Sequence, residues 1–182
     1  SEIPQAVSGS PDDGCFEYNV DTYDSGAVEE YEIAIDVDDG IDFDEADDGD
    51  LNLTMINSLI SGNYDEGVDM DEAGAGGGNL NYINTVAYGN ADDGFKMSEE
   101  DAGGVNGMML GAVSRDNGGK GAVFEEEDGG NVRVHVADTH TANNDDSDDT
   151  GLEVVQDDAG EGELIVEAST IEDGIDAEGV TV

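Results

Sequence analysis

The segment Val132-Arg133-Val134-His135-Val136 alternates apolar and polar side chains over its whole length. Successive side chains of a β-strand point to opposite faces, so this alternation is typical of a strand with one buried face. Residues 31–37 follow the same pattern, with Tyr31, Ile33, Ile35 and Val37 on the apolar phase. The sequence therefore predicts strands that cover a hydrophobic core.

The composition is extremely acidic. The 182 residues include 48 Asp and Glu but only 4 Lys and Arg, for a net charge of −44. An acidic disordered chain and a folded, salt-adapted protein both have such a composition. The ordered apolar pattern favours the folded protein, because a disordered tail has no reason to keep it. Its carboxylates would be screened in concentrated salt, where the Debye length is about 3 Å at 1 M.

Three classes of partner or location are disfavoured by the same composition. Four basic residues cannot neutralise a series of phosphates, so a nucleic acid is not expected to bind. They also give no attraction to an anionic membrane, and no apolar run approaches the ~20 residues of a membrane span. Residues 1–4 lack the basic and apolar regions of a signal peptide, which predicts synthesis in the cytoplasm.

Short strands separated by turns are predicted along most of the chain. The turns are clusters of Gly, Asp and Asn, residues that tolerate positive φ. Eight to ten such strands predict an all-β sandwich or barrel. The predicted strands are 15–23, 28–38, 51–60, 79–88, 105–115, 121–125, 131–139, 152–156, 163–169 and 175–182.

The length favours a single domain over residues 1–182, with an N-terminal arm at 1–14 and strands and loops at 15–182. Residues 51–60 also carry a helical pattern, but the alternation of Leu51, Leu53 and Met55 favours a strand. The recurring Asp-Asp-Gly turns are interpreted as turn chemistry and not as an internal repeat.

Catalytic motifs are not recognisable in the chain. No Asp or Glu lies in a conspicuously apolar stretch that would raise its pKa for general acid catalysis. His135 falls on the polar phase of its strand and His140 follows five residues later, without zinc-binding spacing. We therefore expect no enzyme activity and no required cofactor.

One segment approximates a calcium loop. Asp146, Asp148 and Thr150 place oxygen atoms at positions 1, 3 and 5, Gly151 follows, and Asp157 stands at position 12. The spacing makes Ca2+ or Mg2+ a candidate ligand, beside the Na+ or K+ of a high-salt medium. The flanks read as strands instead of helices, so a plain acidic loop is the competing interpretation.

Cys15 is the only cysteine, which excludes an internal disulfide. Two interpretations remain open for it. It is either a small buried hydrophobic residue or half of an intermolecular disulfide.

As a whole, the chain resembles the small major capsid protein of tailless, icosahedral haloarchaeal viruses that contain an internal membrane. The resemblance rests on the start Ser1-Glu2-Ile3-Pro4-Gln5, the length near 180 residues and the ladder of strands from Phe16 to Val182. It implies a single vertical jelly roll, an antiparallel sandwich of about eight strands.

The resemblance also implies self-assembly into a capsid shell together with a second, larger capsid protein, and hence location in the virion of a haloarchaeal host. Three alternatives stay open. They are a decoration or head protein of a tailed haloarchaeal virus, a halophilic calcium-binding β-domain, and a halophilic enzyme on a jelly-roll fold.

Overall fold

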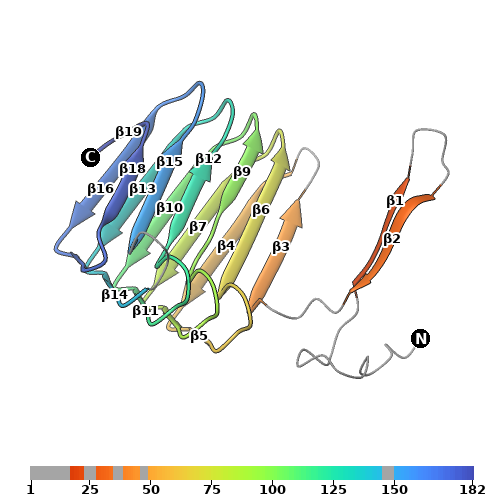
Figure 1. Ribbon diagram of the computed structural model, residues 1–182. Coiled ribbons are helices and arrows are strands. Elements are labelled where there is room, and N and C mark those ends of the chain that lie inside the picture. Colours follow the sequence, from red (N-terminus) through yellow and green to blue (C-terminus); the bar gives the residue numbers. More distant parts are fainter. Residues whose placement is uncertain (1–16, 23–27, 35–38, 46–48, 145–149) are drawn as a thin grey trace.

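The protein forms a parallel β-solenoid (Figure 1). The computed structural model describes residues 17–22, 28–34, 39–45, 49–144 and 150–182. All regular elements in these ranges are β-strands, and no helix occurs among them. The prediction of an all-β protein is confirmed.

Three parallel sheets make up the solenoid, and each of the first five coils contributes one strand to each sheet. We call them the acidic sheet, the amide sheet and the short sheet. The acidic sheet contains β3 (Ile41–Glu45), β6 (Val68–Gly74), β9 (Ser98–Asp101), β12 (Val123–Glu126), β15 (Leu152–Gln156) and β18 (Ile175–Glu178). The amide sheet contains β4 (Leu51–Ile56), β7 (Gly78–Ile83), β10 (Val105–Leu110), β13 (Val132–Ala137), β16 (Gly162–Glu167) and β19 (Val180–Thr181). The short sheet contains β5 (Leu59–Ser61), β8 (Val86–Tyr88), β11 (Val113–Arg115), β14 (His140–Ala142) and β17 (Thr170–Ile171).

The predicted antiparallel jelly roll is wrong. Each solenoid strand pairs in parallel with the equivalent strand of the next coil: Leu53 lies opposite Leu80, and Leu80 opposite Gly107. Equivalent residues are 27 apart over most of the molecule, so the chain does contain an internal repeat. The one antiparallel pair in the described ranges is β1 (Glu17–Thr22) with β2 (Val28–Ala34), which pair only with each other.

At the corner between the amide and short sheets, the chain changes direction at a single residue in the left-handed conformation. Asn57, Asn84, Asp138 and Ala168 have φ of 53°, 49°, 49° and 50°, and Gly111 has 62°. A positive φ reverses the direction of side chains over a single residue, so the strand bends sharply without a long loop. The predicted strands 51–60, 79–88 and 105–115 are thus each two strands that lie in different sheets.

Inward-facing side chains fill the space between the three sheets. The alternating segment Val132–Val136 lies in β13. Its three valines, Val132, Val134 and Val136, are all buried in the core. Tyr82 stacks on Phe95 with 4.3 Å between ring centroids. A Cβ at Gly107 would lie 2.5 Å from the Phe124 ring, so only glycine fits opposite this ring. Burial of such apolar side chains contributes about 1.5–3 kcal/mol each.

Asparagines form a ladder inside the corner between the short and acidic sheets. Asn63, Asn90 and Asn117 each donate from Nδ2 to Oδ1 of the asparagine in the next coil, at 2.9, 3.0 and 2.9 Å. Asn144 ends the series by donating to Oδ2 of Asp173 at 2.9 Å. The ladder lets polar side chains occupy the interior with their hydrogen bonds satisfied.

Candidate functional site

Carboxylates are distributed unequally over the outer surfaces of the solenoid. The outward positions of the acidic sheet carry more of them than those of the other two sheets, including Asp42, Asp44, Asp69, Asp71, Glu100, Glu125, Asp176 and Glu178. Two lysines also lie on this side, where Lys96 pairs with Asp69 at 3.1 Å and Lys120 pairs with Glu153. The sheet is a solvated, charged surface in which few carboxylates have a basic partner.

The outer surface of the amide sheet is different over its first three coils. Its outward positions there contain amides, one hydroxyl and apolar side chains, and none is acidic. They are Asn52, Thr54, Ile56, Asn79, Asn81, Ile83, Asn106, Met108 and Leu110. We call these nine residues the neutral face. More than a quarter of the chain is acidic, so a surface of nine positions without a carboxylate is a departure from the rest of the molecule.

Hydrogen bonds between coils order the neutral face. Asn106 donates from Nδ2 to Oδ1 of Asn79 at 3.2 Å, and Asn81 donates to the Thr54 hydroxyl at 3.4 Å. Next to these rows, Ile56 is 55% exposed and Leu110 is 39% exposed. The face therefore combines a flat, hydrogen-bonded amide surface with an apolar row along its edge.

The lack of carboxylates continues around the corner onto the short sheet. Outward positions of β5, β8 and β11 hold Leu59, Ser61, Val86, Tyr88, Val113 and Arg115. Leu59 is 66% exposed, and the Arg115 guanidinium lies 4.3 Å from the centre of the Tyr88 ring. Two adjoining surfaces of the first three coils thus have almost no negative charge.

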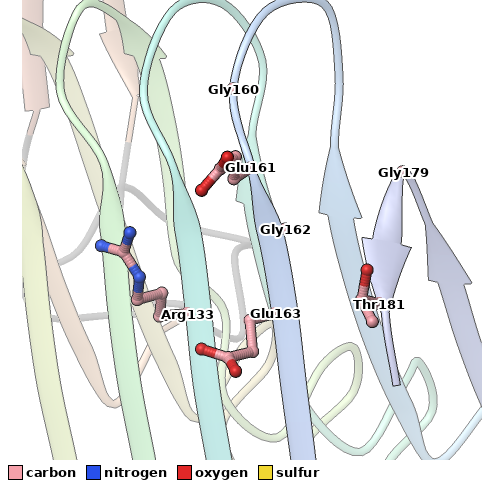
Figure 2. Close-up of a pocket in the computed structure, with 7 residues that line it drawn as sticks. All are labelled: Arg133, Gly160, Glu161, Gly162, Glu163, Gly179 and Thr181. Atoms are coloured by element: carbon pink, nitrogen blue, oxygen red, sulfur yellow. The ribbon is translucent and has the colours of Figure 1, made fainter.

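Basic groups follow in the next coil, and carboxylates return after it. Both histidines face outward there, His135 with Nε2 3.4 Å from Glu167 and His140 with Nε2 3.1 Å from Glu172. Figure 2 shows a shallow surface pocket at this end of the amide sheet, where Arg133 of β13 and Glu163 of β16 occupy neighbouring strands. This end of the amide sheet carries both positive and negative side chains, so it is not part of the neutral face.

A compact acidic cluster lies at the corner that leads from the short sheet into the acidic sheet. Carboxylate oxygens of Asp39, Glu66 and Asp69 lie within 4.8 Å of one another, and Glu66 is 8% exposed. Burial, with the negative charges of Asp69 and Asp65, raises the pKa of Glu66 to about 9. Lys96 approaches Glu66 at 3.8 Å and supplies a positive charge to this cluster.

The residues of the predicted calcium loop are not all brought together. Asp146 and Asp148 lie outside the described residues, as does Cys15. Thr150 is buried before β15, whereas Asp157 is exposed after it, and the five-residue strand Leu152–Gln156 runs between them. An extended strand of this length spans roughly 17 Å, so Thr150 and Asp157 are too far apart to share one ion.

The comparisons with known proteins give no relative. No family model matches the chain, no curated protein matches it, and no solved structure matches it. A search of the described residues finds no helix that is long and apolar enough to cross a membrane.

Proposed function

We propose that this protein is a non-enzymatic, salt-adapted structural module that associates with copies of itself through the neutral face. The observation that carries the proposal is the lack of carboxylates on that face in a chain with a net charge of −44. Removing a charged group from water costs several kcal/mol when it has no partner. A surface of amides and apolar side chains is the part of this solenoid that a like-charged copy can bury at low cost.

High salt is part of the proposed association. At 1 M salt and above the Debye length is about 3 Å or less, so carboxylates outside the contact repel only at short range. In dilute buffer the remaining charge of two copies would keep them apart. We therefore expect assembly at multimolar salt and dissociation as the salt is removed.

The size of the face sets the strength of a single contact. Six residues along three strands cover roughly 20 by 14 Å, or about 300 Å². A stable interface buries about 800 Å² on each partner, so one such contact is weak. The adjoining surface of the short sheet points in another direction and offers a second contact, which favours an extended assembly over an isolated dimer.

The fold does not support the capsid hypothesis. The capsid proteins that this chain resembles form a jelly roll, whereas this chain forms a solenoid. Self-association does not depend on that resemblance, since it rests on the outer surface of β4, β7 and β10. A viral role is not part of the present proposal.

Sedimentation velocity in 3 M NaCl tests the proposal through a matched pair of variants. Met108→Glu adds a carboxylate to the middle outward position of β10 on the neutral face, and Ala73→Glu adds one to an outward, half-buried position of β6 on the acidic sheet. We expect concentration-dependent association of the unmodified protein and of Ala73→Glu. Met108→Glu should weaken association at least 10-fold.

Two outcomes would reject the proposal. One is a monomer at every protein concentration in 3 M NaCl. The other is an equal loss of association in Met108→Glu and Ala73→Glu, which would mean that added charge acts regardless of its position.

A further inference from the structure

A column of glutamates runs through the interior at the corner between the acidic and amide sheets. Glu45, Glu72, Glu99 and Glu126 occupy the same inward position in four successive coils, and Gln156 continues the column in the fifth. Glu72 is 1% exposed, and Glu99 and Glu126 are fully buried. Buried glutamates are rare unless they are paired.

The hydrogen bonds to Glu72, Glu99 and Glu126 differ in number. Glu126 accepts bonds from the backbone N–H of Gly130 at 2.6 Å, the N–H of Asp128 at 3.2 Å and the side-chain amide of Gln156. Glu99 accepts one bond, from Gly103 at 2.8 Å through Oε1, and its Oε2 has no partner. Neither carboxylate oxygen of Glu72 has a hydrogen-bond partner.

Within the described residues, no basic side chain pairs with Glu72 or Glu99. Of the two lysines on the acidic sheet, Lys96 pairs with Asp69 and Glu66, and Lys120 pairs with Glu153. Burial raises the pKa of Glu72 and raises that of Glu99 to about 7, which reflects the cost of holding negative charge there. Two buried carboxyl groups this close together are stable only if their negative charge is neutralised, either by a proton or by a cation from outside the chain.

We propose that Glu72 and Glu99 bind a calcium ion between their carboxylates, inside the solenoid. Neighbouring strands lie about 4.8 Å apart, so an ion midway between stacked carboxylates is about 2.4 Å from an oxygen of each. That distance matches the 2.3–2.6 Å of Ca2+–oxygen bonds and exceeds the 2.0–2.1 Å of Mg2+. Two carboxylates also match the charge of a divalent ion.

The outer surface of the acidic sheet is also rich in carboxylates beside the column. A surface pocket there is lined by Glu45 and Glu72 together with the outward carboxylates Asp44 and Asp71. These outer carboxylates would attract a cation toward the opening and raise its local concentration. The proposed site therefore has unpartnered ligands and lies beside a strongly acidic surface.

Thermal unfolding in constant 2 M NaCl tests the site, with 10 mM CaCl2 or with EGTA. The test variant is Glu72→Gln/Glu99→Gln, which removes both charges and keeps the shape of the side chains. Stacked amides can hydrogen-bond along the column as the asparagines do, so this variant should fold. The control is Glu161→Gln/Glu163→Gln, which removes two exposed carboxylates at the other end of the solenoid.

Calcium should raise the Tm of the unmodified protein and of the control by the same amount, roughly 5–10 °C at 100 times the Kd. The rise should be lost in the test variant, and calorimetric titration should show one fewer high-affinity ion per chain.

An equal calcium response in all three proteins would overturn the proposal, because the ion would then bind to surface carboxylates only. The absence of a response in all three would also overturn it, since the column would then be neutralised by protons. The single variant Glu99→Gln provides a further check, because its amide can donate to Glu72. It should be at least as stable as the unmodified protein in EGTA and should gain little from calcium.

Discussion

At the scale of single residues, position within a coil decides what a polar side chain does. Asn117 is buried and both donates and accepts, through bonds with Asn90, Asn144 and Ser114. Asn106 has the same side chain but lies on the outer surface, where it donates to Asn79. Water can replace the bond of Asn106, whereas nothing replaces the bonds of Asn117.

This difference predicts unequal effects of two alanine substitutions. Asn117→Ala leaves buried partners in two neighbouring coils without a bond and should lower the free energy of unfolding by about 2–4 kcal/mol. Asn106→Ala should lower it by less than about 1 kcal/mol. Urea unfolding of both variants in 3 M NaCl measures the difference. Equal losses would contradict the internal ladder.

At the scale of elements, the sequence was sufficient to place many of the strands. The predicted ranges 51–60, 79–88 and 105–115 coincide with β4–β5, β7–β8 and β10–β11. Their pairing could not be read in the same way, because Gly, Asn and Asp favour positive φ both in antiparallel hairpins and in solenoid corners. The bend inside each range was missed because one left-handed residue leaves the hydrophobic pattern almost unbroken.

The repeat was visible in particular residues. Asn63, Asn90, Asn117 and Asn144 are spaced by 27, and so are Glu45, Glu72, Glu99 and Glu126. The asparagines were hidden among the turn residues, and the glutamates were hidden among the many other acidic residues of the chain. The neutral face was missed for the same reason, since outward positions can be compared between coils only after the spacing is known.

The corner between the amide and short sheets predicts opposite effects of two substitutions. Ala168 has φ of 50°, so Ala168→Gly removes strain and should raise the free energy of unfolding by about 0.5 kcal/mol. Gly111→Ala introduces such strain and places a Cβ 2.6 Å from Oδ1 of Asn84, so it should lower that free energy by more than about 1 kcal/mol. The urea midpoint at constant salt measures both. Similar changes of the same sign would contradict the proposed role of the corner.

At the scale of the whole molecule, the charge of −44 competes with the core. Most carboxylates lie on outer surfaces and turns, where salt screens them and where they stay hydrated. The amount of charge was evident from the composition. The lack of negative charge on the neutral face was not evident from the composition, because it depends on which side chains face outward.

The solenoid should unfold when the salt is removed. Circular dichroism in 3 M NaCl should show mostly β-strand, and dialysis to 0.1 M NaCl should abolish that signal, because repulsion between carboxylates is then unscreened. Return to 3 M NaCl should restore it, which distinguishes repulsion from aggregation. A strand signal that persists in 0.1 M NaCl would reject salt adaptation.

The 27-residue register of the first four coils gives the molecule a measurable unit of length. Each set of 27 residues advances the solenoid by one strand spacing, about 4.8 Å, without altering the cross-section. Duplication or deletion of one such unit in the gene would therefore change the reach of the protein in fixed steps. The length of such a solenoid can therefore change only by whole coils.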